Sequence, residues 1–276
     1  MIEFLRALGS QTFLQYAFAA GILASLGCGV MGTFVVVRRI AFLAGGIAHA
    51  VLGGMGLALY LGYSPLGGAL VAAVAAALII GIVSLRAREH EDTLIGAIWA
   101  VGMALGVVFI SQTPGYNSEL MSYLFGNILM VTSGDLLLMA VLDLFLIIIV
   151  GLFFRQLQAV TFDEEFSRLR GLPADLLYLS LLVLAALTVV LLIRVVGLIL
   201  VIALLTLPAA VAGQWTGSLG RMMGLASILG AIFTTGGLAL SYGPDLPAGA
   251  TIILLAGSVF IVSTIFKSRR IRGRQS

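Results

Sequence analysis

This sequence has few charged residues for its length. Asp, Glu, Lys and Arg make up 10% of its 276 residues, hydrophobic residues make up 61%, and the mean hydropathy is +1.17. An ordinary soluble domain has about 25% charged residues. This composition therefore excludes an ordinary soluble domain. Apolar runs of about 18 residues or more recur along the whole chain, which is typical of membrane-spanning helices. We therefore expect an all-α polytopic membrane protein that forms one transmembrane domain over residues 1–276.

Cysteine, lysine and histidine are also scarce, and each scarcity excludes a kind of site. The single cysteine, Cys28, lies in an apolar run, which excludes a disulfide within the chain and favours a packing role. The single lysine, Lys267, follows Phe266, so the chain has no GxxxxGK[ST] phosphate-binding loop. Two histidines and one cysteine cannot form a dense permanent metal site. No Ser-His-Asp, HExxH or paired-cysteine pattern indicates an enzyme, and we expect neither a bound cofactor nor a nucleic-acid partner.

Nine segments are predicted to span the bilayer as helices. They are residues 11–37, 42–62, 66–85, 93–112, 134–154, 175–193, 195–213, 222–242 and 248–266. If the N-terminus is outside, 13 of the 15 Lys and Arg residues lie on the inner side, as the positive-inside rule requires. The inner set is Arg38, Arg39, Arg86, Arg88, Arg155, Arg168, Arg170 and Arg221, with Lys267, Arg269, Arg270, Arg272 and Arg274 in the basic tail 267–276. We therefore predict a cytoplasmic C-terminus, and a tail that either holds the last span in place or binds anionic lipid or a protein.

The outer side of the predicted bundle has two further features. The segment 120–132 is too short to cross, and we interpret it as a re-entrant or interfacial half-helix. A tenth span there would disturb the charge sorting. Arg194 begins the seventh span at the outer surface. It either snorkels to the interface or pairs with an outer acid such as Glu119 and helps to close the outer mouth.

The polar loop at residues 161–173 has the pattern of a short amphipathic cytoplasmic helix. Thr161 is its predicted N-cap, with Glu164 completing a capping box, and Gly171 is its predicted C-cap. The apolar positions are Phe162, Phe166 and Leu169, and the charged positions are Asp163, Glu164, Glu165, Arg168 and Arg170. At about nine residues it is too short to cross a bilayer. It either docks on a partner or is a solvated connector.

Two ionisable residues lie within predicted spans, where such groups are costly and often functional. His49 shares a helical face with Gly45 and Gly53. Its imidazole is therefore open either to a substrate or to a hydrogen bond from a neighbouring helix. Asp143 lies in the middle of the fifth span and must face the bundle interior, either on an ion path or in a structural hydrogen bond.

Several segments resemble the permease subunits of ABC importers for metal ions, a family that carries manganese, zinc or iron. They are VVRRIAFLAGGIAHAVLGG at 36–54, EDTLIGAIWAVGMALGVVFIS at 91–111, SYLFGNILMVTSGDL at 122–136, FDEEFSRLRGLP at 162–173, RVVGLILVIALLTLPAAVAG at 194–213 and DLPAGATIILLAG at 245–257. Each segment alone is a modest match. In this order and spacing they are specific, and they cover nearly the whole chain.

This resemblance implies that residues 161–173 form a coupling helix, which docks in a groove of a separate cytoplasmic ATPase that holds Mg-ATP. The apolar and charged positions given above would supply the contacts. Two permeases and two ATPases would form the core in a prokaryotic plasma membrane, and an extracytoplasmic solute-binding protein would deliver the ion. The permease would catalyse no covalent chemistry. The ion path would include His49, as a transient metal contact, with Glu119 and Asp143, and Arg194 would belong to the outer gate.

The sequence departs from the family pattern at Gly45. The family commonly has an aspartate on the presumed ion path at this position, four residues before the histidine that corresponds to His49. Mn²⁺ prefers oxygen ligands, so the missing carboxylate weakens the argument for manganese. Either the path depends on His49 and Glu119, or the substrate is something other than a bare ion.

Three alternatives remain open from the sequence. A permease for iron chelates or cobalamin has a related architecture. A secondary transporter or channel would show inverted repeats and paired broken helices, and it would leave the capped cytoplasmic helix without a role. An intramembrane enzyme would need convergent catalytic groups, which the sequence does not offer.

Overall fold

The computed structural model describes residues 2–86, 91–113, 126, 128–244 and 246–272. Every regular element within these residues is helical, which confirms the predicted all-α fold. The elements are α1 (Ile2–Ser10), α2 (Thr12–Val37), α3 (Ala41–Tyr60), α4 (Pro65–Arg86), α5 (Glu91–Ser111), the 3-10 helix η2 (Ile128–Met130), α7 (Ser133–Leu152), α8 (Phe154–Phe162), α9 (Glu164–Leu169), α10 (Ala174–Trp215), α11 (Leu219–Tyr242) and α12 (Ala248–Arg272).

In the described part of the chain, nine helical segments are long and apolar enough to cross a membrane. They are α2, α3, α4, α5, α7, the two halves of α10, α11 and α12. Their ends agree with the nine predicted spans to within a few residues. Each has 20 residues or more, which gives about 30 Å of helix, the thickness of the hydrocarbon core. The protein is therefore a multi-pass membrane protein.

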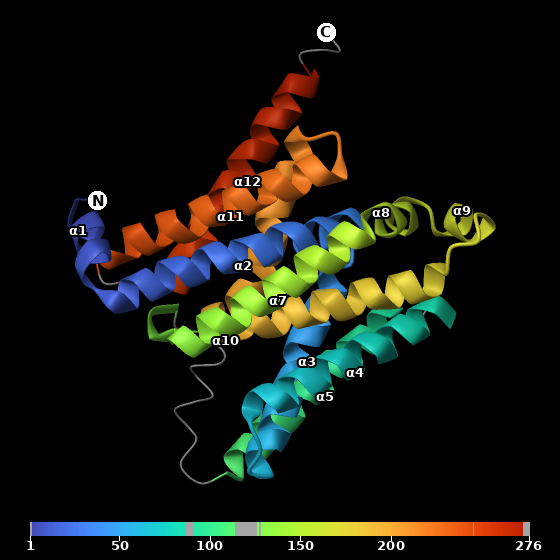
Figure 1. The fold of residues 1–276 in the computed structure, drawn as a ribbon, viewed down its shortest axis with the longest axis horizontal. Helices are drawn as coiled ribbons and strands as arrows, with labels where there is room; N and C mark the ends of the chain where they lie inside the picture. The colour runs from blue at the N-terminus through green and yellow to red at the C-terminus, as the bar shows by residue number, and fades with distance from the viewer. Residues whose placement is uncertain (1, 87–90, 114–125, 127, 245, 273–276) are drawn as a thin grey trace.

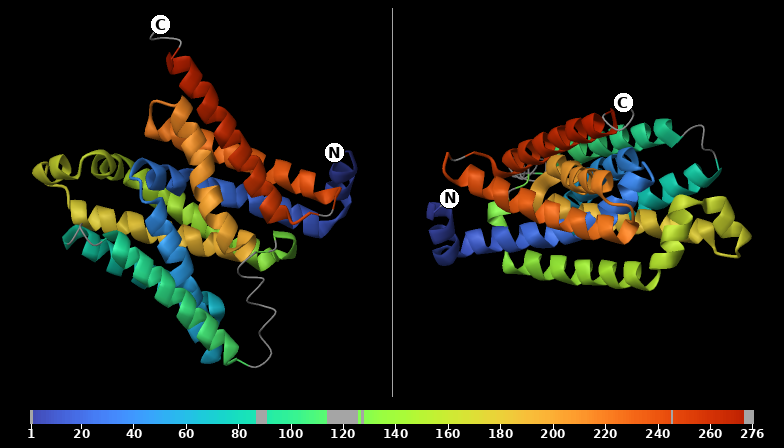
Figure 2. Two further views of the ribbon diagram at one scale, coloured as in Figure 1. Left: turned by 180° about the vertical axis from the view of Figure 1, so that it is seen from behind. Right: turned by 90° about the horizontal axis from the view of Figure 1, so that it is seen from above.

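The sixth and seventh predicted spans are joined without a loop. Both lie in α10, where only Gly197 departs from helical geometry, with φ 74° and ψ 167°. Glycine adopts this left-handed φ readily because it has no Cβ. Gly126, with φ 64°, packs on this break so closely that a Cβ there would collide with Val196 and Gly197. The second half of α10 leaves the direction of the first, as Figure 2 shows from behind.

Helices α2 and α10 form the centre of the bundle. α2 packs on α7, α10 and α11, whereas α10 also packs on α3, α4 and α12. Phe34 and Met31 of α2 and Leu182 of α10 are fully buried in one continuous core. In Figure 1, α3, α4 and α5 lie on one side of this centre and α11 and α12 on the other.

Helices α3 and α5 approach each other through glycines. A Cβ on Gly53 would lie 2.9 Å from the Gly102 carbonyl oxygen, and one on Gly56 would lie 2.8 Å from that of Gly106. The GxxxG pattern at 102–106 is therefore a small-residue contact between helices. It holds α3, which carries His49, tightly against α5.

Two features near the N-terminal end of the bundle extend or revise the predictions. The sequence did not predict α1, whose Phe4 packs edge-on against Tyr242 of α11 with ring centroids 6.0 Å apart.

Of the predicted half-helix 120–132, residues 120–125 and 127 lie outside the described residues. The remainder contains η2, which packs on α2. A capping box between Thr132 and Asp135 then starts α7.

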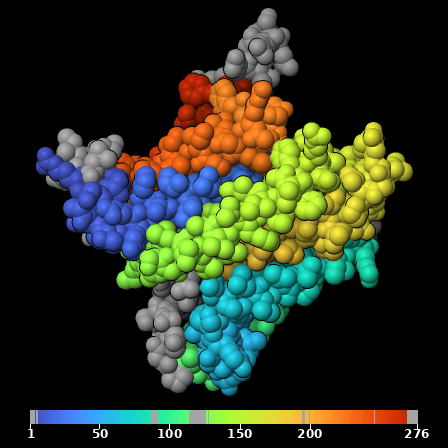
Figure 3. Space-filling view, in the orientation of Figure 1, coloured from blue at the N-terminus to red at the C-terminus, as the bar shows by residue number. Residues whose placement is uncertain are grey.

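The segment formed by α8 and α9 projects from the opposite end of the bundle. It is the yellow-green to yellow projection at the right of Figure 3, beyond α7. α9 packs on α8 and α10. The described residues thus place the predicted docking segment at the far end of the molecule from the N-terminus (Figure 1).

Candidate coupling surface and substrate path

The segment predicted as one helix is two helices with a break at Asp163. This residue has an extended backbone, φ −151° and ψ 98°, between α8 and α9. Asp163 is the N-cap of α9, because its Oδ1 accepts a hydrogen bond from the Phe166 N–H at 2.9 Å. The prediction of Thr161 as the cap was wrong, since its hydroxyl donates to the Leu157 carbonyl within α8 at 2.6 Å. Thr and Asp are both common N-cap residues, so the sequence pattern fitted either position.

The C-cap of α9 is Arg170, one residue before the predicted Gly171. Gly171 follows the helix with φ 78°. Its N–H donates to the Arg168 carbonyl at 2.9 Å, and the Leu172 N–H donates to the Ser167 carbonyl at 3.1 Å. This is how a left-handed glycine satisfies the last carbonyls of a helix.

Three large apolar side chains of this segment are exposed. Phe162 is 64% exposed, Phe166 50% and Leu169 87%. Phe162 ends α8, so the predicted single apolar face is divided between two helices. The Arg170 guanidinium lies 4.9 Å above the Phe166 ring. Apolar side chains exposed together outside a membrane are typical of an interaction surface.

The charged side chains of this segment divide between the bundle and the solvent. Glu164 faces the bundle: its carboxylate lies 3.1 Å from Arg38 and its side chain is 12% exposed. Arg168 bridges Glu164, at 2.8 Å, and Asp175 of α10, at 2.5 Å. Glu165 is exposed. Asp163, Arg168 and Arg170 are also exposed, whereas Glu164 is directed inward. The docking role of these side chains stays a prediction.

His49 lies on α3 against the indole of Trp99 on α5. The two rings are stacked, with centroids 4.1 Å apart and planes 13° apart. The imidazole Nδ1 is buried and has no hydrogen-bond partner among the described residues. A Cβ on Gly45 would touch Trp99 and Ile202 at 3.4 Å. The indole therefore fills the space that a longer side chain at position 45 would need.

Asp143 lies on α7 and is 4% exposed, so it faces the bundle interior as predicted. Its Oδ2 is buried without a hydrogen-bond partner in the described structure. Its Oδ1 faces α2, where a Cβ on Gly27 would approach it to 2.6 Å. Thr188 of α10 lies beside the same glycine. The absence of a side chain at Gly27 thus makes room for the carboxylate.

The structure does not gather the predicted path residues into one cluster. Within the described ranges, no three His, Cys, Asp or Glu residues come together as a metal-binding group. His49 contacts α5, whereas Asp143 faces α2 and α10. Glu119 lies outside the described residues. For Arg194 only the backbone is described, three residues before Gly197. The path and gate roles of these residues stay predictions.

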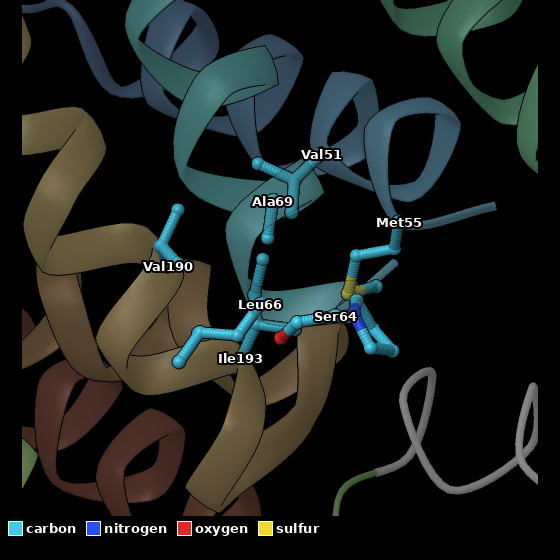
Figure 4. Close-up of a pocket in the computed structure, with 8 residues that line it drawn as sticks. Val51, Met55, Ser64, Leu66, Ala69, Val190 and Ile193 are labelled. Atoms are coloured by element: carbon cyan, nitrogen blue, oxygen red, sulfur yellow. The ribbon is translucent and has the colours of Figure 1, made fainter. Parts of the chain in front are cut away.

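The cavities of the described structure differ in polarity. One of about 120 Å³ lies between α3, α4 and α10 (Figure 4). Among the described residues that line it, Ser64 supplies the single polar side chain. A larger cleft, of about 550 Å³, opens beside α8 and α9 and is lined by charged residues that include Arg38 and Asp92.

The sequence as a whole matches known proteins over almost all of its length. Residues 10–267 match the family described as the ABC 3 transport family. The chain belongs to this family. It is 46% identical to an uncharacterized membrane protein of Synechocystis sp., over 97% of this chain and 95% of that protein. It is 36% identical to the manganese transport system membrane protein MntC of Halalkalibacterium halodurans, over 95% of this chain and 89% of that protein.

The ABC 3 family protein also resembles a solved structure, PsaBC from Streptococcus pneumoniae in complex with Fab. The TM-score is 0.87 at 34% sequence identity, and the match covers 95% of each chain. Family membership makes this protein a membrane permease, as the resemblance implied. Two residues that shape the site were not predicted. Trp99 stands in an apolar run without a motif, and Arg38 looks like any basic residue at the inner end of a span.

Proposed function

We propose that this ABC 3 family permease is the membrane subunit of an ATP-driven importer for a divalent transition metal ion, namely manganese, zinc or iron. The observation that carries the proposal is α9, a short capped helix that exposes Phe166 and Leu169 at one end of the bundle. The chain has no phosphate-binding loop of its own. ATP hydrolysis therefore belongs to a separate cytoplasmic ATPase that holds Mg-ATP, and α9 is the surface on which it docks.

The remaining parts of the assembly follow from this role. A second copy of the permease completes the pathway, and an extracytoplasmic solute-binding protein delivers the ion. The N-terminus lies outside and the C-terminus in the cytoplasm of a prokaryotic cell. Metal as cargo is supported by the name of the MntC relative, a manganese transport system membrane protein.

The ion crosses by weak, successive contacts rather than through a resident metal site. His49 supplies an imidazole, which suits zinc and iron, and Asp143 and Glu119 supply carboxylates, which suit manganese. Arg194 belongs to the outer gate. Both Asp143 Oδ2 and His49 Nδ1 are buried without a partner in the described structure, and such groups are costly unless something satisfies them. A passing cation would do so.

A second candidate, a permease for a metal chelate, rests on Gly45 alone, where the sequence lacks the carboxylate that the family commonly has. In that case the reconstituted complex would hydrolyse ATP without moving a bare ion.

Docking is tested by co-purifying the permease with its cognate ATPase. Phe166→Asp should abolish association without unfolding the bundle, because it places a charge in an apolar contact. Arg221→Asp is the control, since Arg221 is exposed on α11 and lies outside α9. Association that survives Phe166→Asp would overturn the docking role of α9.

A further inference from the structure

Arg38 ends α2 and touches three other elements through its guanidinium. Its Nη1 donates to the Val160 carbonyl of α8 at 3.0 Å, and its Nη2 donates to Glu164 of α9 at 3.1 Å. The same group lies 4.5 Å above the ring of Tyr178 on α10. The Arg38 side chain is 14% exposed. A planar guanidinium suits such simultaneous contacts because its donors are fixed in one plane.

The contacts continue beyond Arg38 in two directions. The Tyr178 hydroxyl lies 3.2 Å from the Ser84 hydroxyl at the end of α4. Glu164 also accepts from Arg168, which reaches Asp175 at the start of α10. We name Arg38, Glu164 and Tyr178 the Arg38 cluster. It links α2, α8, α9 and α10 directly, and α4 through Tyr178.

The Arg38 cluster is a main attachment of α9 to the rest of the bundle. With six residues, α9 is too short to be stable alone. The cleft of about 550 Å³ lies between it and the ends of α4 and α5. Among the described residues, α9 packs on α8 and α10. Its polar side chains contact the two central helices at their ends, α2 at Arg38 and α10 at Asp175.

Arg38 lies at the turn that joins α2 to α3. Arg39 follows it with φ 60°, a conformation that residues with a side chain rarely adopt. This turn leads from α2 into α3, the helix of His49. A displacement of α9 that pulls on Arg38 therefore acts on the corner between α2 and α3.

We propose that Arg38 is a positioning residue that transmits movement of α9 to the corner between α2 and α3, and so couples ATP hydrolysis to transport. The proposal rests on the function proposed above. It assigns Glu164 to the inner side of this connection rather than to the ATPase contact.

The first test uses the full-length permease alone, in lipid nanodiscs. Leu169→Cys places a spin label on α9, because Leu169 is 87% exposed and the native Cys28 is buried. Arg38→Ala should increase the mobility of the label, and so should Glu164→Gln. The double variant should match the single ones, since residues that act as one unit are not additive. Arg155→Ala, which removes an exposed arginine of α8 outside the cluster, should change nothing.

The second test uses the complete complex with binding protein and Mn²⁺ in proteoliposomes. Arg38→Ala should keep the ATPase bound and hydrolysing but lower the Mn²⁺ taken up per ATP by roughly tenfold. Arg38→Lys keeps the charge but not the planar donors. Its uptake of Mn²⁺ per ATP should lie between that of the wild type and that of Arg38→Ala. A merely structural role would lower hydrolysis and uptake together.

The two tests separate the inference from the proposed function. Unchanged label mobility in Arg38→Ala would overturn the connection, whatever the transport result. An unchanged ratio of Mn²⁺ to ATP in a complex whose wild type transports would overturn it as well. Failure of the wild-type complex to take up any ion would instead contradict the proposed function.

Discussion

The imidazole of His49 lies 4.1 Å from the indole of Trp99 and nearly parallel to it. Stacking of this kind fixes the plane of a ring without using its nitrogen atoms. Nδ1, which has no partner among the described residues, keeps its hydrogen-bonding capacity for another group. The indole occupies the space that a side chain longer than that of alanine would need at position 45.

Substitution of Gly45 tests this arrangement at the residue scale. Gly45→Ala should be tolerated, because its Cβ would meet Trp99 and Ile202 at 3.4 Å, an ordinary contact. Gly45→Asp should lower the free energy of unfolding by about 2–3 kcal/mol, because its carboxylate is buried against the indole. Trp99→Ala in the same chain should restore part of the loss. The measurement is thermal unfolding in detergent, and equal midpoints for Gly45→Ala and Gly45→Asp would contradict the packing described.

Asp143 offers a second test at this scale. Asp143→Asn keeps the shape of the side chain and removes its charge. The unfolding midpoint should therefore change little, whereas ion uptake by the reconstituted complex should fall by about tenfold or more if the carboxylate contacts the ion. Asp92→Asn, which alters an exposed acid on α5, is the matched control. Wild-type uptake by Asp143→Asn would leave Asp143 only a structural role.

At the scale of elements, α9 and α3 are each held in place by specific local contacts. α9 is held in place by an N-cap at Asp163, a left-handed Gly171 and the ion pair to Arg38. α3 is held against α5 by glycines that face the opposite backbone. The first element exposes Phe166 and Leu169 at one end of the bundle, and the second carries His49. Arg38 lies in the chain between α2 and α3, so the two elements are connected.

Two glycines of α5 test the close approach of α3 and α5. A Cβ on Gly102 would lie 2.6 Å from the Ala50 Cα, whereas one on Gly96 would meet nothing within 4 Å. Gly102→Ala should therefore cost about 1–3 kcal/mol of stability by overpacking. Gly96→Ala, on the same helix, should be neutral or slightly stabilising. Thermal unfolding of the two variants checks this, and equal stability would contradict the described contact.

At the scale of the whole molecule, the nine spans could be predicted from the sequence because hydropathy and length determine them. The break at Gly197 could not, because a loop and a single left-handed glycine leave the same apolar pattern. The N-cap was misplaced by two residues because Thr161 and Asp163 are both suitable. The contacts of Trp99 with His49 and of Arg38 with Glu164 depend on how the helices pack. A single sequence does not show that packing.

The most direct test of the central claim is uptake of Mn²⁺, Zn²⁺ and Fe²⁺ by vesicles that contain this permease with its cognate ATPase and binding protein, with and without ATP. We expect ATP-dependent uptake of at least one of the three ions, and lower uptake in the His49→Ala variant. An intact complex that hydrolyses ATP and moves none of the three would contradict it, and would make Gly45 the residue that indicates a different solute.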